Sequence, residues 1–116
     1  MGHMDSPFVV ARPDATGYEP FIHHDVPVGE FRQVAITSGQ PALEAGYWRS
    51  EPATYTYVFD TDETFVVLDG AATIELDSGE TVEVRAGDMA YFAAGRRSTW
   101  TITESFRKFV VVPAAD

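Results

Sequence analysis

A short segment of the sequence, YTYVFDTDET, places a tyrosine and a glutamate where they could carry out proton chemistry. Side chains alternate between the two faces of a β-strand, so Glu63 shares a face with the apolar residues Phe65 and Val67. Burial on such a face would raise the pKa of the carboxyl group and suit it to act as a general acid or base. We therefore expect Glu63 and Tyr57 to be the catalytic candidates. The alternative is a solvated Glu63 that caps the turn at residues 60–62.

The surrounding sequence supplies rings and guanidinium groups that could form a small-molecule site. Binding pockets combine apolar walls with a few polar groups, and a guanidinium suits a carboxylate or phosphate ligand. We expect the ligand-binding residues to be Arg49, Tyr55, Phe59, Phe65, Tyr91, Arg96, Ser98 and Trp100. The alternative is that the rings only fill the core of a narrow barrel and that the arginines pair with nearby acids.

Short β-type segments separated by turn signals must position these residues. Asp69-Gly70 and the Ser-Gly pair that ends at Gly79 are typical of hairpin turns, and no segment repeats apolar residues at helical spacing over three turns. This pattern predicts an all-β sandwich or small barrel over residues 36–116. The expected strands are residues 46–50, 54–59, 64–68, 72–76, 81–84, 89–92, 99–103 and 106–112.

The N-terminal part of the chain differs in composition. Residues 1–4 (MGHM) are typical of a leader derived from an expression vector, and residues 5–35 are interrupted by prolines and glycines. Because proline cannot serve a central strand, we expect an irregular N-terminal arm with one or two short edge strands. The arm has no core of its own, which favours a homodimer in which it covers a strand edge. Adjacent strand residues face opposite ways, so at most one of His23 and His24 should reach the barrel.

Composition limits the partners and the location. The formal net charge is -10, from 18 acids and 8 bases, which disfavours binding to nucleic acid or to an anionic membrane. No apolar run approaches the about 20 residues needed to span a bilayer. The chain contains no cysteine, which excludes disulfides and thiolate metal sites and is compatible with a cytoplasmic location.

Two motifs in the barrel region resemble the paired motifs of the cupin family. The resemblance is strongest to the small single-domain cupins related to ureidoglycine aminohydrolase and the ethanolamine-utilisation cupin, and it extends over about residues 36–112. It implies a jelly-roll-like β-barrel. The matching residues are Glu63, Gly70, Gly87-Asp88, Ala93-Ala94-Gly95, Thr99-Trp100 and Lys108-Phe109.

The sequence departs from the cupin pattern at the metal ligands. In the family two histidines precede the motif glutamate and a third lies in the second motif, and imidazole and carboxylate groups of this kind suit a first-row metal. Tyr57, Phe59 and Ser98 stand at the three histidine positions here. We therefore expect no metal and no cofactor in the barrel. The neighbours Arg107 and Lys108 are expected to pair with surface acids.

Three functions remain open from the sequence, and the sequence does not decide whether the protein is an enzyme. The first is binding of a small, anionic organic molecule, with or without metal-independent catalysis of the isomerase, lyase or C–N hydrolase type. The second is a non-catalytic ligand-binding or accessory subunit. The third is a metal-dependent, aminohydrolase-like enzyme with atypical ligands, to which His23 or His24 could contribute.

Overall fold

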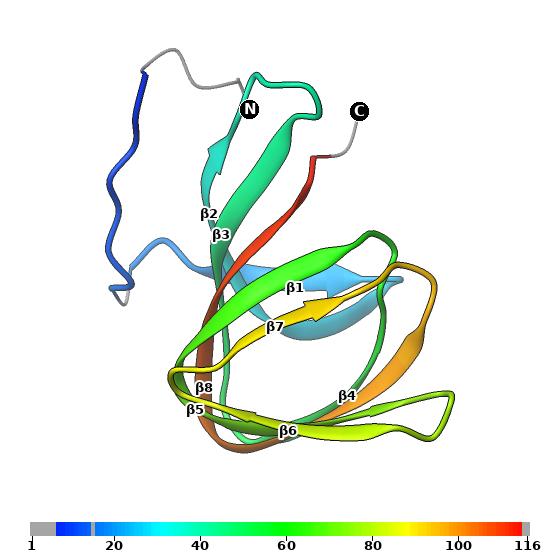
Figure 1. Ribbon diagram of the computed structural model, residues 1–116. Coiled ribbons are helices and arrows are strands. Elements are labelled where there is room, and N and C mark those ends of the chain that lie inside the picture. The colour runs from blue at the N-terminus through cyan, green and yellow to red at the C-terminus, as the bar shows by residue number, and fades with distance from the viewer. Residues whose placement is uncertain (1–6, 15, 115–116) are drawn as a thin grey trace.

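The computed structural model describes residues 7–14 and 16–114, and the leader expected at residues 1–4 lies outside them (Figure 1). All regular structure in the described residues is β, which confirms the all-β prediction. Within the same residues there is no helix of the length and apolarity that would cross a membrane. The strands are β1 (Glu19–His23), β2 (Val26–Ile36), β3 (Leu43–Ser50), β4 (Ala53–Val58), β5 (Glu63–Leu76), β6 (Thr81–Arg85), β7 (Met89–Phe92) and β8 (Arg97–Pro113).

The two longest strands, β5 and β8, form the antiparallel ribbon on which the barrel is built. The first part of β5 pairs with the last part of β8, and strands β7 and β3 continue this sheet on either side. The later part of β5 pairs with the start of β8, and strands β6 and β4 flank it there. The ribbon thus belongs to two sheets that curve around a common interior (Figure 1).

Strand β5 runs through the Asp69-Gly70 pair, so the hairpin turn expected at that position is wrong. Gly70 has a φ of 81°, and the pairing register with β8 shifts on both sides of it. A Cβ atom at Gly70 would lie 2.1 Å from the carbonyl oxygen of Ser105. Glycine is therefore required by a bulge and a close backbone approach, and the bulge bends β5 from one sheet into the other. The two segments expected at 99–103 and 106–112 are likewise one strand, β8.

The N-terminal region is more regular than the sequence predicted. Strand β1 is a short edge strand, as expected, but β2 has 11 residues and lies between β1 and β3. Proline is tolerated there because Pro27 stands near the start of β2 and Pro20 lies in edge strand β1. Residues before β1 run along the outside of the sheet, held by Arg32 Nη1, which donates to the Arg12 carbonyl at 2.7 Å. The division between arm and barrel at residue 35 stays a prediction.

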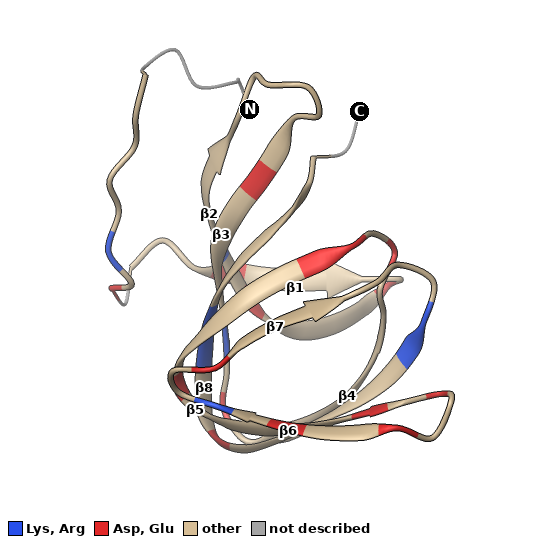
Figure 2. Cartoon of the chain, in the orientation of Figure 1, with Lys and Arg blue, Asp and Glu red and all other residues tan. Residues whose placement is uncertain are grey.

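Aromatic side chains form the centre of the interior. Trp48, Trp100 and Phe106 are at most 6% exposed, and their rings meet edge to face with centroids about 6 Å apart. Most of the described acidic residues are exposed, and several lie on β6 and in the turn before it (Figure 2). The negative net charge is therefore carried by the surface, while the interior is built from rings.

Candidate functional site

A cavity of about 140 Å³ lies inside the barrel beside this aromatic centre. Its wall is mainly apolar, with two carboxylates and one ammonium group among the rings. It is lined by Phe21, Val28, Phe31, Glu44, Trp48, Tyr55, Tyr57, Glu63, Trp100, Lys108, Val110 and Val112. This combination of apolar walls and a few polar groups is typical of a small-molecule site.

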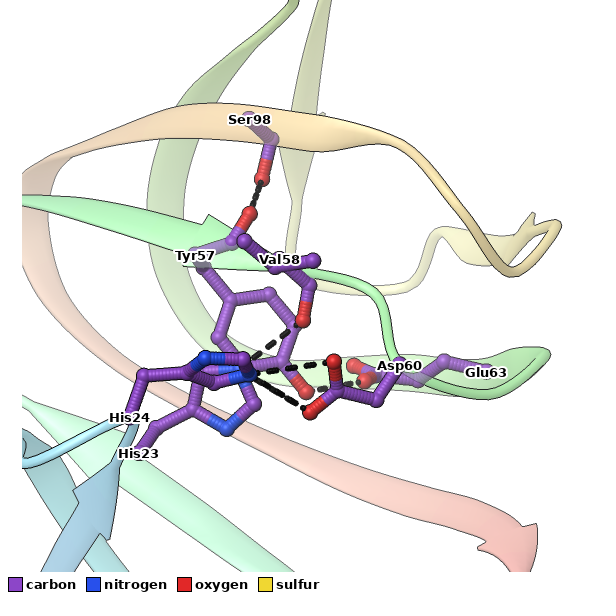
Figure 3. Close-up of polar contacts among 7 residues, drawn as sticks. All are labelled: His23, His24, Tyr57, Val58, Asp60, Glu63 and Ser98. Atoms are coloured by element: carbon purple, nitrogen blue, oxygen red, sulfur yellow. Dashed lines mark hydrogen bonds and ion pairs between the residues drawn. The ribbon is translucent and has the colours of Figure 1, made fainter.

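Glu63, the first residue of β5, is buried in the wall of the cavity and is only 3% exposed. The alternative of a solvated Glu63 is therefore wrong. The hydroxyl of Tyr57 donates a hydrogen bond to Glu63 Oε1 at 2.8 Å (Figure 3). The strands β4 and β5 thus bring together the two residues that the sequence suggested for proton chemistry.

Lys108 is the counter-charge of Glu63, and the sequence analysis did not find it. Its Nζ donates to Glu63 Oε2 at 2.6 Å, and the residue is 6% exposed, so the expected pairing of Lys108 with surface acids is wrong. The ammonium also lies 4.3 Å from the Phe65 ring centroid and 4.5 Å from that of Trp100. Such distances give favourable cation–π contacts. Both oxygens of the carboxylate are therefore occupied by donors.

Strand alternation explains why Lys108 points inward. Phe106, Lys108 and Val110 are all buried and share one face of β8, whereas Arg107 faces outward and pairs with Asp69. Alternate residues on either side of Lys108 in the sequence are apolar, and this alternation predicts that the lysine side chain points into the barrel.

Tyr57 remains a neutral hydrogen-bond donor well into the alkaline range. Burial raises the pKa of its phenol above the usual value, and the negative charge of Glu63 raises it further. Its backbone is fixed by Ser98, whose Oγ donates to the Tyr57 carbonyl at 2.7 Å. Ser98 is buried and does not line the cavity, so its contact is with the strand that carries Tyr57.

The structure places only part of the predicted ligand set at the cavity. Tyr55 and Trp100 line it together with Tyr57 and Glu63. Phe65 lies behind the wall, where its ring contacts Lys108. The wall residues that were not expected come from β1, β2, β3 and β8. Those on β1 and β2 are Phe21, Val28 and Phe31, in a segment that was expected to be irregular.

Other predicted residues lie away from the cavity. Phe59 is completely buried in the core and stacks on Phe92 with centroids 4.7 Å apart. Tyr91 is 57% exposed on the outer surface of strand β7. Side chains alternate between the inner and outer faces of a strand. Which alternate set faces inward depends on the pairing register, which the sequence did not reveal.

The two arginines expected to bind an anionic group also lie outside. Arg96 is exposed, and its Nη1 is 3.5 Å from Asp77 Oδ1. Arg49 donates to Glu30 at 2.8 Å and lies over the ring of Tyr18. Both arginines therefore pair with neighbouring acids, which was the alternative reading of the sequence.

His23 and His24 both lie at the mouth of the barrel (Figure 3), and neither is among the residues that line the cavity. His24 and Asp25 have φ values of 51° and 66°, so the chain leaves the strand conformation directly after His23. The ring of His23 packs on Tyr57 with centroids 4.4 Å apart, and the ring of His24 lies beside it (Figure 3). His24 Nε2 is 2.9 Å from the carboxylate of Asp60.

The antiparallel barrel with a cavity among its rings agrees with the fold of the cupin class. Residues 37–109, more than half of the chain, match the EutQ-like cupin domain family. The chain belongs to this family, which confirms the resemblance drawn from the sequence.

Solved structures show the same fold. A putative ethanolamine utilization protein Q from Salmonella typhimurium is 18% identical with a TM-score of 0.66, covering 85% of this chain and 95% of that one. The EutQ protein of Clostridium difficile is 22% identical with a TM-score of 0.65; 75% of this chain is covered and only 63% of that chain. A DUF861 family protein from Thermotoga maritima is 28% identical with a TM-score of 0.54, covering 55% of this chain and 73% of that one. No curated protein matches this chain.

The barrel residues do not fit the metal site that the cupin class implies. Phe59 has no side-chain atom that could bind a metal ion. The hydroxyl of Ser98 donates a hydrogen bond to the backbone carbonyl of Tyr57. Glu63 is paired with Lys108, whose positive charge a metal ion at that carboxylate would have to displace. Tyr57 is a neutral phenol that already donates to Glu63. The interior therefore provides an ion pair where the class implies a metal.

Proposed function

We propose that this cupin binds a small, largely apolar organic molecule in its barrel cavity, without the three-histidine metal site. The observation that supports the proposal is the cavity of about 140 Å³ with ring walls and one buried ion pair. An apolar cavity of about 150 Å³ is large enough for benzene, so the ligand should be about the size of one ring. Cytoplasmic location remains part of this proposal.

The polar end of the ligand is best matched by a hydrogen-bond acceptor such as a carbonyl oxygen. An ammonium group has three donors, and Lys108 uses one of them on Glu63 within the described residues. Its remaining contacts there are with rings. The sequence suggested an anionic ligand, but the two arginines lie outside the cavity, and Glu44 adds a second negative charge to its wall. A neutral carbonyl compound therefore suits the wall better than an anion.

The two tryptophans of the sequence, Trp48 and Trp100, both line the cavity, so their fluorescence reports binding directly. We expect cyclohexanone to bind more tightly than cyclohexanecarboxylate or cyclohexylamine. Lys108→Met should weaken cyclohexanone binding about tenfold or more, as expected for loss of a hydrogen bond to a charged group. Arg107→Met, on the opposite face of the same strand, serves as the matched control. The proposal is wrong if the carboxylate binds best or if both variants bind alike.

Proton transfer next to the bound carbonyl is a second candidate, favoured by the contacts of 2.8 and 2.6 Å that Tyr57 and Lys108 make with Glu63. Glu63 would accept a proton from the carbon beside the carbonyl, and the electron pair would move to the oxygen held by Lys108. Deuterium exchange into cyclohexanone, followed by NMR, should then be lost in Glu63→Gln while binding remains. Binding without exchange in the original protein would favour the non-catalytic alternative, a ligand-binding or accessory subunit.

We also propose a homodimer as the working form. The supporting feature is the run of apolar residues on the outer surface before β1, where Phe8, Val9 and Val10 are 69%, 44% and 72% exposed. Exposed apolar residues that are contiguous in this way commonly mark protein contacts.

The metal-dependent, aminohydrolase-like function suggested by the resemblance is the least supported by the barrel residues.

A further inference from the structure

The tip of the β1–β2 hairpin carries two imidazoles that face the loop between β4 and β5. His23 ends β1, and the left-handed backbone of His24 turns its ring toward the same side. A non-glycine residue at positive φ is uncommon, although histidine adopts it more readily than most residues. Asp60, on the opposite loop, accepts from His24 at the barrel mouth (Figure 3). Three metal-binding side chains from two separate segments therefore meet at one point.

The spacing of their donor atoms matches that of ligands around a metal ion. One nitrogen or oxygen from each of the three residues lies within 4.8 Å of the others. Asp60 Oδ2 is 3.6 Å from His23 Nε2 and 2.9 Å from His24 Nε2. Ligands about 2.1 Å from a tetrahedral zinc ion are about 3.4 Å apart, so small side-chain rotations would complete the geometry.

We propose that His23, His24 and Asp60 bind one zinc ion at the mouth of the barrel. Imidazole and carboxylate are both good zinc ligands, and three protein ligands leave the fourth tetrahedral position open. The Val58 carbonyl oxygen, 2.9 Å from His23 Nε2, or a water molecule can take that position. Zinc would take the place of the hydrogen bonds that now join the ring nitrogens to Asp60 and Val58. A charged imidazole would release its proton when it binds the ion.

This site is separate from the cavity and does not depend on the proposed ligand. Its carboxylate is Asp60, whereas the buried ion pair uses Glu63. The two are nevertheless neighbours, because His23 packs on the ring of Tyr57. A bound ion would tie the β1–β2 hairpin, which supplies part of the cavity wall, to the loop after β4.

Zinc binding can be measured by calorimetry on chelator-treated protein. His3 is the one other histidine of the sequence, and imidazole is a zinc ligand, so the measurements should use a His3→Ala background. We expect one zinc ion per chain. Asp60→Asn and His24→Ala should each weaken binding at least about tenfold, the scale seen even for residues that only support metal ligands. Both side chains are more than half exposed, so neither change should unfold the protein.

Asp62→Asn is the matched control, since it removes the same charge from the same loop and Asp62, which accepts a hydrogen bond from the Ala94 amide, is not part of the cluster. It should bind zinc as the background protein does. Cobalt(II) in place of zinc should give the visible absorption of a four-coordinate ion, and Asp60→Asn should abolish it. Absence of zinc binding in the His3→Ala protein, or equal affinities of Asp60→Asn and Asp62→Asn, would overturn the proposal.

Discussion

At the scale of single residues, Glu63 and Lys108 form a buried ion pair in the wall of the cavity. The lysine is the only one in the sequence, and it is placed among three rings with its ammonium 2.6 Å from the carboxylate. Desolvation of two charges is costly, and their attraction offsets this cost only when both partners are present. Loss of both charges should therefore cost the fold less than loss of one of them.

Removal of one partner should destabilise the protein strongly. Glu63→Gln leaves an unpaired ammonium in the interior, and Lys108→Met leaves an unpaired carboxylate, so each should lower the free energy of unfolding by about 3–5 kcal/mol. The double variant carries neither charge. Its free energy of unfolding should be higher than that of the less stable of the two single variants. Urea unfolding measures all three.

The exposed pair of Arg107 and Asp69 provides the control. Asp69→Asn should change the free energy of unfolding by less than about 1 kcal/mol, as is usual for an ion pair near the surface. A double variant as unstable as the sum of the two single variants would contradict a coupled pair. It would indicate that Glu63 and Lys108 act independently.

At the scale of elements, the bulge at Gly70 decides how β5 serves both sheets. The strand brings Glu63 into the cavity wall at its start and pairs with β6 after the bulge. Without the bend, the strand would continue in one sheet and could not close the interior. The sequence pair Asp-Gly indicates a special backbone conformation, but the same pair is typical of a hairpin turn.

Gly70→Ala tests the requirement for glycine at this bulge. Gly70 and Gly79 both have positive φ values, 81° and 96°, but only Gly70 has atoms where a Cβ would lie. Gly79→Ala should lower the free energy of unfolding by about 1–2 kcal/mol through backbone strain alone. Gly70→Ala should lower it by about 1–3 kcal/mol more, because the methyl group meets the Ser105 carbonyl. Thermal or urea unfolding that gave equal losses would argue against the close approach.

At the scale of the whole molecule, the outer surface of the sheet formed by β2, β3 and β8 is covered only in part. Residues before β1 cross this surface and are held by polar contacts, including Arg107 Nη1 to the Pro13 carbonyl at 2.7 Å. Apolar side chains of the same segment are nevertheless exposed, Phe8 and Val10 most of all. A second copy of the chain would remove them from water.

The homodimer is tested by sedimentation equilibrium, for which we expect twice the mass of the chain. Val10→Asp should shift the protein toward the monomer, because a carboxylate cannot be buried in an apolar contact without a partner. Val82→Asp, an equivalent change at a residue of β6 that is 43% exposed, should leave the dimer intact. A monomer in the original protein, or equal behaviour of both variants, would contradict the dimer.

The sequence by itself determined the fold class, because short alternating segments and glycine-rich turns allow few structures other than a β-barrel. It also placed Glu63 on the apolar face of its strand with Phe65 and Val67, since the face of a strand is fixed by its period of two. The tertiary structure alone decided which side chains meet across strands. Lys108 is far from Glu63 in the sequence, and only the pairing of β8 with β5 joins them. The same holds for His24 and Asp60, which are brought together by a left-handed residue at a hairpin tip. Local periodicity specifies the direction of a side chain, whereas its partner depends on strand register and bulges, which are set by long-range packing.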